Sequence, residues 1–287
     1  MAAIYKRELQ SYFMGIIGYV FVAFLLVIFG IYTATICLTS KYANFEYVPY
    51  AMKYVFLITT PILSMRVLSE ERKLNTDKLL FSTAVESYKI VFGKYLAMLT
   101  VMAIPFIVTC AYPVILSKYG KVPMLTAYSS IFGLFLMGAA LLAIGMFSSS
   151  LTDSQIVAAA ICFGMILAAY LANDITGLVS KTVFSALIGY TVIVLIIGGI
   201  TRYVSKSWSF AGSIVLLFEI LVVGIYFIKP SLEVSSFSGL LGTIAVFDKM
   251  DTFKNGVFDI STVIYYLSVI GVFSFFSIQS LEKRRWG

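Results

Sequence analysis

The sequence predicts an all-α integral membrane protein: a polytopic bundle of about eight transmembrane helices in a single membrane domain covering residues 1–287. Hydrophobic residues make up 60% of the chain and charged residues only 12%, whereas soluble domains carry about a quarter charged residues. The mean hydropathy is +0.97. The apolar residues also form runs of about 20, the length that a helix needs to cross roughly 30 Å of hydrocarbon.

Eight apolar runs are each long enough for one crossing, and the fifth and sixth of them are the shortest. No sequence repeat or soluble domain interrupts them. The predicted spans are Ile16–Leu38, Val48–Val67, Tyr95–Leu116, Leu125–Phe147, Gln155–Ala172, Val183–Ile200, Phe210–Ile228 and Ser261–Gln279.

The basic residues predict the orientation of these spans. With the N-terminus in the cytosol, the lysines are divided between the two sides, but every arginine falls in an inner segment. The positive-inside rule therefore predicts that both termini are cytoplasmic. The formal net charge of +7 is then loop charge that orients the spans, and it gives no reason to expect nucleic-acid binding. The arginines are Arg7, Arg66, Arg72, Arg202, Arg284 and Arg285.

The segment Ala2–Met14, before the first span, has the pattern of an amphipathic helix. Its apolar residues fall on one helical face and its polar residues on the other. This pattern favours a helix that lies in the headgroup plane. The alternative is a simple cytosolic extension of the first span. The apolar face holds Ile4, Tyr5, Leu9, Tyr12 and Phe13, and the polar face holds Lys6, Arg7, Gln10 and Ser11.

The last external segment, Lys229–Asp259, differs from the short loops. Its stretch SGLLGTIAVF is apolar enough to enter the membrane but too short to cross it, and Gly239 and Gly242 interrupt it. Asn255-Gly256 is a strong turn signal. We expect a re-entrant or interfacial helical hairpin on the outer face.

The sequence lacks the residue patterns of the common enzyme classes. There is no histidine, the commonest metal ligand and acid–base catalyst. The three cysteines lie in apolar runs without CxxC spacing, so we predict neither a disulfide framework nor a zinc site. Gly93-Lys94 and Gly120-Lys121 are not followed by Ser or Thr, as a Walker-type phosphate loop requires. We therefore expect no catalytic, cofactor or metal site on this chain.

The segment Ser69–Lys94 is the one long charged stretch between predicted spans. It opens with acids and bases, and Asn75-Thr76-Asp77 then starts or breaks a helix. An apolar strip inside the charged loop favours a surface that grips a cytosolic partner. The alternative is a solvated connector. The charged residues are Glu70, Glu71, Arg72 and Lys73, and the strip is Leu74, Leu79 and Leu80.

Three stretches carry a resemblance to a known family. They are SEERKLNTDKLLFSTAVESYKIVFGKYLA, FSSSLTDSQIVA and the C-terminal FDKMDTFKNGVFDISTVIYYLSVIGVFSFFSIQSLEKRRW. The first resembles the signature of ABC-2 type permeases. The last is similar to the gliding-associated (Gld) and nitrous-oxide-operon branch, in which Gly-Val-x-Asp precedes the last span and Leu-Glu-x-Arg-Arg-Trp ends it.

The chain departs from this family pattern at three places. Asn75-Thr76 stands where the family usually has Gly-Thr, and Ala84 where a Pro often follows the Leu pair. The typical branch member has six spans, so the two spans within about 183–228 look like an insertion into a six-span core.

The resemblance implies a half-transporter, of the exporter type, in a bacterial plasma (inner) membrane. Two permease subunits, as a homodimer or as a heterodimer with a relative, would sit over two cytosolic ATPase subunits that hold ATP and Mg. The helix around Leu74–Thr83 would be the coupling helix docked in the ATPase. The implied coupling residues are Glu70, Glu71, Arg72, Thr76, Leu79, Leu80 and Thr83.

Two intramembrane features are further candidates. Glu219 is the only acid deep in a predicted span, and such acids usually face a partner or a cavity. We expect either a role in the substrate path or subunit contact, or a protonated side chain bonded to a neighbouring helix. Small residues also recur every fourth position, which predicts close helix packing, either between subunits or within the bundle. They are Ala160, Gly164, Ala168 and Ala172.

Two other function classes stay open. A secondary transporter driven by an ion gradient would need charged or broken spans near the midplane in both halves. A non-transporting membrane anchor for an ATPase in an envelope machine would share most of the same sequence features. The substrate cannot be read from the sequence, because one architecture serves many cargoes.

Overall fold

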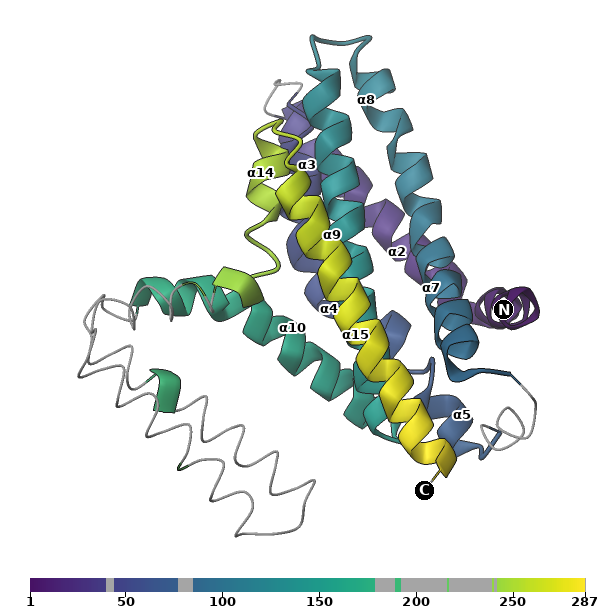
Figure 1. Cartoon of the computed structure of the whole chain (residues 1–287). Helices are drawn as coiled ribbons and strands as arrows, with labels where there is room; N and C mark the ends of the chain where they lie inside the picture. Colours follow the sequence, from purple (N-terminus) through teal and green to yellow (C-terminus); the bar gives the residue numbers. More distant parts are fainter. Residues whose placement is uncertain are drawn as a thin grey trace. The chain divides into compact units, whose positions relative to one another are not determined.

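Figure 1 shows the computed structural model of the chain, which describes residues 1–39, 44–76, 85–178, 189–191, 216, 239 and 242–286. Contacts divide the chain into two compact units, Met1–Ala168 with Val246–Gly287 and Ala169–Ala245. The described residues form helices and turns, without a strand.

The first unit holds most of the described helices, and α10 begins in it and ends in the second unit. The elements are α1 (Ala2–Met14), α2 (Ile16–Thr33), the π-helix η1 (Ala34–Thr39), α3 (Tyr47–Met52), the 3-10 turn η2 (Lys53–Val55), α4 (Phe56–Ser64), α5 (Ser69–Lys73), α7 (Ser87–Thr109), α8 (Ala111–Leu116), α9 (Met124–Leu151), α10 (Gln155–Leu178), α14 (Met250–Lys254) and α15 (Ile260–Trp286).

Within the described residues, six helical stretches are long and apolar enough to cross a membrane. They overlap six of the eight predicted spans. The other two predicted spans, Val183–Ile200 and Phe210–Ile228, lie almost entirely outside the described residues, as does Glu219. The six stretches are Ile16–Thr39, Tyr47–Lys73, Ser87–Leu116, Met124–Leu151, Gln155–Ala172 and Ile260–Arg285.

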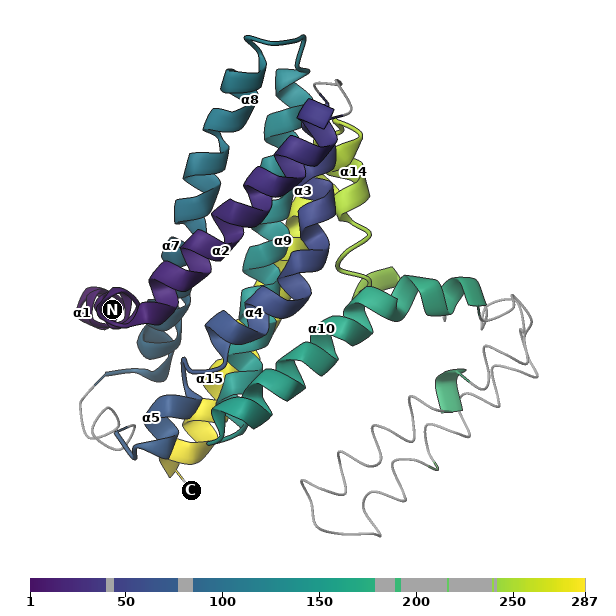
Figure 2. The same cartoon turned by 180° about the vertical axis from the view of Figure 1, so that it is seen from behind.

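Helix α9 is the centre of the first unit. Its most apolar window is 83% buried, against 22–56% for the other candidate spans. Figures 1 and 2 show α15 along one face of α9 and α4 along another, and these helices contact it. Small residues allow the close approach, as they do in other membrane bundles. A Cβ atom at Gly138 would lie 2.6 Å from the Phe56 ring, and one at Gly145 would overlap Ser64.

Helix α1 has the bounds that the sequence predicts, Ala2–Met14. Figures 1 and 2 look along its axis, whereas the long helices run across the picture, so α1 lies crosswise to the bundle. It packs against α2 and α7. The turn into α2 is tight, because a Cβ atom at Gly18 would stand 2.6 Å from the carbonyl oxygen of Tyr12. The crosswise direction suits an interfacial helix, and its depth in the membrane stays a prediction.

At the end of the bundle away from α5, the short helix α14 packs on α3 and α9. Asn255-Gly256 forms a turn, as the sequence predicts, and Gly256 has a φ of 74°. The amide of Gly256 donates to Phe253 O and that of Val257 to Thr252 O, which is the Schellman pattern. Of the predicted re-entrant segment Lys229–Asp259, residues 229–238, 240 and 241 lie outside the described residues.

Asp259 starts the last span three residues after Gly256. Its carboxylate accepts from the Ser261 amide at 2.9 Å and from the Thr262 hydroxyl at 2.8 Å, so it caps the first turn of α15. The Gly-Val-x-Asp motif thus ends one helix and begins the next.

Candidate functional site

Parts of all three sequence stretches that carry the family resemblance meet at one end of the first unit, the third through its C-terminal Leu-Glu-x-Arg-Arg-Trp motif. This end holds α1, α5, the start of α7, the end of α9 and the end of α15, and we call it the charged end. Each arginine in the described part of the chain lies there, and the side of the membrane that this end faces stays a prediction. Figure 1 shows α5 beside the C-terminal end of α15.

Lys94 is the centre of the charged end. It lies on α7, and its side chain is 1% exposed. Its ammonium group lies 2.9 Å from Glu8 Oε1, 3.0 Å from Glu71 Oε2 and 2.8 Å from the carbonyl oxygen of Val67. An ammonium group has three donors, so all three are used. This one side chain therefore joins α7 to α1, to α5 and to the turn before α5.

Arg7 completes this cluster. Its Nη2 lies 3.0 Å from Glu8 Oε1 and also pairs with Glu71 Oε1. Two cations thus face two carboxylates, and the four charges cancel. Such matching is needed because a buried charge without a partner costs several kcal/mol.

The cluster also sets the ionisation of its members. Burial opposes the charged form of Glu8, but attraction to Lys94 and Arg7 and their hydrogen bonds outweigh burial, so the pKa of Glu8 lies below its ordinary value. Desolvation likewise opposes the charged form of Arg7, and its two carboxylate partners raise its pKa above the ordinary value. Both groups are therefore held in their charged forms.

A second pair extends the cluster toward the start of α5. Arg66 Nε donates to Glu70 Oε2 at 2.9 Å, and its Nη2 donates to Ser11 Oγ at 3.3 Å. The same guanidinium lies 5.8 Å from the centre of the Tyr12 ring. Between these groups is a polar cavity of about 280 Å³, lined by Arg7, Glu8, Ser11, Tyr12, Arg66, Val67, Glu70, Glu71, Leu74, Thr76 and Lys94.

The start of helix α5 is hydrogen-bonded to Ser149 of α9. Ser149 Oγ accepts from the amides of Leu68 and Ser69 at 3.0 and 3.1 Å, and it donates to Met65 O at 3.1 Å. A hydroxyl has one donor and two acceptor positions, so this group is fully used.

Helix α5 ends at Asn75, which has a φ of 55°. The Asn75 amide donates to Arg72 O and the Thr76 amide to Glu71 O, a second Schellman motif. Glycine and asparagine are the residues that adopt this left-handed conformation most readily. The departure from Gly-Thr to Asn75-Thr76 therefore keeps the backbone requirement.

The C-terminal helix α15 closes the site from the other side. Arg72 is buried and donates to Ser280 Oγ at 3.4 Å, and Ser280 donates to Ser150 O at 2.8 Å. Arg284 of the Leu-Glu-x-Arg-Arg-Trp motif pairs with Asp153 of the FSSSLTDSQIVA stretch at 2.6 Å. Its neighbour in that motif, Arg285, donates to Val85 O at 3.2 Å, where the chain enters α7.

The predicted coupling residues fall into two groups. Glu70, Glu71, Arg72 and Thr76 are brought together around α5. Glu71 and Arg72 contact other helices, whereas Glu70 pairs with Arg66 and the Thr76 hydroxyl donates to Glu71 O. Residues 74–76 form the turn that ends α5, and Leu74 is 64% exposed. Leu79, Leu80 and Thr83 lie in residues 77–84, outside the described part, so the coupling helix itself stays a prediction.

The sequence pattern did not identify five residues of this site, which are Arg7, Glu8, Lys94, Ser149 and Asp153. The predicted span begins at Tyr95, so Lys94 was the last residue of the charged segment. The structure begins the helix at Ser87 and buries Lys94 two turns inside it, where an ammonium group needs carboxylate partners. Its neighbour Gly93 has a steric role, since a Cβ atom there would lie 3.2 Å from the Ile4 side chain of α1.

The predicted small-residue row on α10 is divided. Ala160, Gly164 and Ala168 are exposed, and a Cβ atom at Gly164 would meet nothing within 4 Å. Ala172 is 2% exposed. The choice between subunit contact and packing within the bundle stays open.

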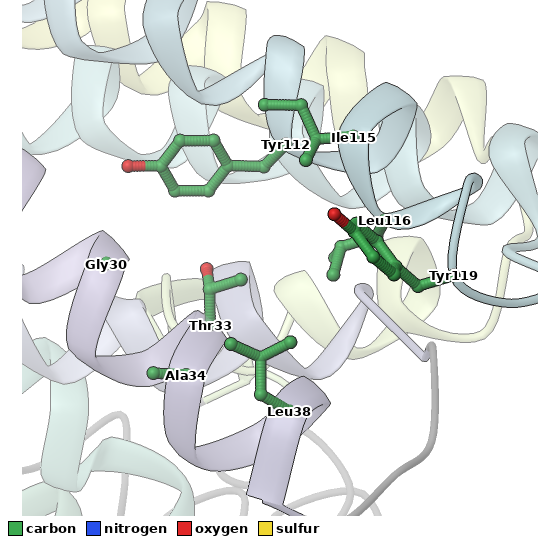
Figure 3. Close-up of a pocket in the computed structure, with 8 residues that line it drawn as sticks. All are labelled: Gly30, Thr33, Ala34, Leu38, Tyr112, Ile115, Leu116 and Tyr119. Atoms are coloured by element: carbon green, nitrogen blue, oxygen red, sulfur yellow. The ribbon is translucent and has the colours of Figure 1, made fainter.

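A second cavity lies at the opposite end, between α2 with η1 and α8 (Figure 3). It has a volume of about 390 Å³ and is mostly apolar. Within the described residues, no group of three or more Cys, Asp or Glu side chains could hold a metal ion. The cavity is lined by Gly30, Thr33, Ala34, Leu38, Tyr112, Ile115, Leu116 and Tyr119.

Long apolar helices that meet at a charged, ion-paired end define a multi-pass helical membrane protein. The family is shown by comparison: residues 38–183, about half of the chain, match the ABC-2 family transporter proteins. The chain belongs to this family and is an ABC transporter permease. The match begins near the end of the first span and stops where the predicted insertion of 183–228 begins. Comparisons with curated proteins and with solved structures give no match.

Proposed function

We propose that this permease is the membrane subunit of an ATP-driven exporter and that a cytosolic ATPase docks on the charged end. The observation that carries the proposal is the connectivity of α5. Polar contacts join it to α1 and α7 through Glu71, to α9 through Ser149 and to α15 through Arg72. A force applied to α5 would therefore reach four helices at once.

The surface beside α5 suits a docking partner. Leu74 and the polar residues Lys73 and Thr76 are exposed at its end, next to residues 77–84 with the predicted apolar strip. ATP-driven closure of two ATPase subunits would push this surface and bias the bundle between two states. The coupling is reciprocal, so bound substrate would change the affinity of the ATPase for ATP.

The remaining parts of the assembly follow from the resemblance. ATP and Mg²⁺ would bind the ATPase subunits, and a second permease subunit, identical or related, would complete the transporter. The charged end would face the cytoplasm of a bacterium, with both termini inside. The Gld and nitrous-oxide-operon branch rests on the C-terminal motifs, which lie beyond the matched residues 38–183.

Docking is tested by purifying the tagged chain from native membranes and identifying any co-purified chain that carries a Walker motif. Leu79→Asp combined with Leu80→Asp, and separately Leu74→Asp, should abolish or strongly reduce ATPase recovery without reducing membrane insertion. Val257→Asp is the matched control, because Val257 is 57% exposed at the opposite end. Unchanged recovery in the Leu variants would contradict the docking site.

Transport is tested separately, in proteoliposomes that contain the purified complex. ATP-dependent movement of a cargo supports the exporter. An ATPase that co-purifies and hydrolyses ATP without any transport would favour the anchor function. Transport driven by a sodium or proton gradient without an ATPase would favour the secondary transporter.

A further inference from the structure

We propose that the apolar cavity between α2, η1 and α8 binds an acyl chain of an anionic phospholipid, whose headgroup lies at Lys118 and Lys121. The volume of about 390 Å³ falls within the range of small-molecule sites, roughly 300–1,000 Å³. This proposal does not depend on an ATPase at the charged end.

The walls of the cavity explain why an acyl chain fits. Figure 3 shows Ala34 and Leu38 facing Ile115 and Leu116 across an open space, with Gly30 at one side. A Cβ atom at Gly30 would meet nothing within 4 Å, so the glycine leaves its side of the cavity open. The wall on η1 is a π-helical stretch, a distortion that is frequent at functional sites.

The few polar atoms of the cavity also suit a lipid. The Thr33 hydroxyl donates to Phe29 O at 2.7 Å, so its hydrogen is used. Tyr112 and Tyr119 place hydroxyl groups beside the apolar lining (Figure 3), and Tyr119 is 83% exposed. Tyrosine at such a border is typical of the membrane–water interface, where acyl chains meet headgroups.

The occupant follows from the position of the cavity. Its walls belong to two candidate spans, and neighbouring side chains such as Ile31 and Val114 are exposed and apolar. In a membrane such surfaces face lipid. The acyl chains of phospholipids are therefore the apolar groups present there at high concentration.

The headgroup charge follows from the turn after α8. Lys118 and Lys121 flank the lining residue Tyr119 and are both exposed, and residues 117–123 contain no acid. In the described part of the chain, the structure gives these two ammonium groups no carboxylate partner. A negative headgroup would complement them, because basic residues at a membrane surface attract anionic lipid.

The first experiment fills the cavity. The full chain is reconstituted in vesicles of equal phosphatidylglycerol and phosphatidylcholine, re-extracted in mild detergent, and analysed by native mass spectrometry for retained lipid. Gly30→Leu should lower retained phospholipid at least about tenfold. Gly271→Leu is the matched control, because a Cβ atom at Gly271 on α15 also meets nothing within 4 Å, and it should retain lipid like the wild type.

The second experiment tests the headgroup. Lys118→Gln with Lys121→Gln should lower the retained phosphatidylglycerol-to-phosphatidylcholine ratio about threefold or more, toward the ratio of the vesicles. Lys73→Gln with Lys283→Gln removes the same charge from exposed positions at the charged end and should leave the ratio unchanged.

A third measurement uses the wild type, so that a folding defect in a variant cannot decide the result. Phosphatidylglycerol with a diazirine on its acyl chain should crosslink to peptides containing Leu38 or Tyr112. Retention of lipid by Gly30→Leu, equal loss in both glycine variants, a wild-type headgroup ratio equal to that of the vesicles, or crosslinks confined to other helices would each overturn the proposal.

Discussion

The two ends of the first unit hold their helices together by different forces. At the charged end, α1, α5 and α7 meet through ion pairs around Lys94. At the opposite end, which we call the aromatic end, α14 is held by packing. Its Phe253 is fully buried against α9, where a Cβ atom at Gly133 would overlap the ring, and the ring lies 6.5 and 6.1 Å from those of Phe132 and Phe258.

Because of this difference, the two ends differ in how easily their helices can adopt a second arrangement. Ion pairs and hydrogen bonds can exchange one partner for another while the groups stay satisfied, so a charged cluster can have two arrangements. Tightly packed rings have few alternatives, because a packed core does not deform continuously. We infer that the charged end is suited to motion and the aromatic end to fixing the helices relative to one another.

Cations occur at the aromatic end too, but in another environment. Lys53 is 4% exposed, lies 3.6 Å from Asp251 Oδ1 and stands 3.9 Å from the centre of the Tyr50 ring. Lys254 stands 4.2 Å from the same ring centre. Ring faces attract cations, so aromatic side chains supply part of what carboxylates supply at the charged end.

The largest expected effect is at Lys94. Lys94→Met should lower the free energy of unfolding by up to about 5 kcal/mol, because the partly buried Glu8 and Glu71 would be left with Arg7 as their shared cation. The measurement is the unfolding midpoint in detergent. Adding Glu8→Gln and Glu71→Gln to Lys94→Met should restore most of the loss. A single variant as stable as the wild type would show that the cluster does not hold this end together.

A smaller loss is expected at the aromatic end. Phe253→Ala should lower the free energy of unfolding by about 3 kcal/mol, since it leaves a cavity that the neighbouring rings fill only in part. Phe258→Ala, at a ring that is 58% exposed, is the control and should cost clearly less. Unfolding midpoints compare the two, and equal losses would mean that Phe253 does not fix α14.

The two Schellman turns allow a comparison of the same backbone at both ends. Asn75→Ala should lower the free energy of unfolding by about 1 kcal/mol. The left-handed conformation costs a residue with a Cβ atom roughly 1–2 kcal/mol, and part of this strain is already present with asparagine. Asn75→Gly should be neutral or slightly stabilising. Gly256→Ala should cost more than Asn75→Ala, because its Cβ atom would also lie 2.8 Å from Thr126 Oγ1. If Asn75→Ala lowered the unfolding midpoint more than Gly256→Ala, the explanation by the close contact with Thr126 would be wrong.

The smallest expected effect is the pH dependence of the charged end. The pKa of Glu8 is lower in the folded chain than its ordinary value. Its contribution to stability is thus complete above about pH 4.3, the ordinary glutamate value, and is lost as the pH falls through the lower folded pKa. The wild-type midpoint should fall on acidification, and Glu8→Gln should reduce this slope. Glu86→Gln, at an exposed pair with Lys89, should keep it.

The sequence predicted what depends on local pattern. The bounds of α1 follow from its amphipathic period, the six described spans follow from hydropathy, and the turn at Asn255-Gly256 follows from its residue types. Each of these can be read from a window of neighbouring residues.

The contacts of the charged end could not be predicted in this way. Lys94 and Glu8 are separated by 86 residues, and Ser149 reaches Leu68 across 81. A single sequence gives no signal for which charges meet over such separations. The charge pattern of Ser69–Lys94 predicts that its acids belong to a site, but it does not identify their partners on α1 and α7. The π-helical end of the first span and the cavity beside it also have no local sequence signal.

The hydroxyl of Ser149 has a mechanical consequence. One oxygen on the most buried helix accepts from two backbone amides and donates to one carbonyl on the segment that leads into α5. Neither partner can slide or rotate against the other without breaking all three bonds at the same atom. A displacement of α5 would therefore have two possible outcomes. Either α9 moves with α5 as a rigid body, or the three hydrogen bonds at Ser149 break together in one all-or-none step.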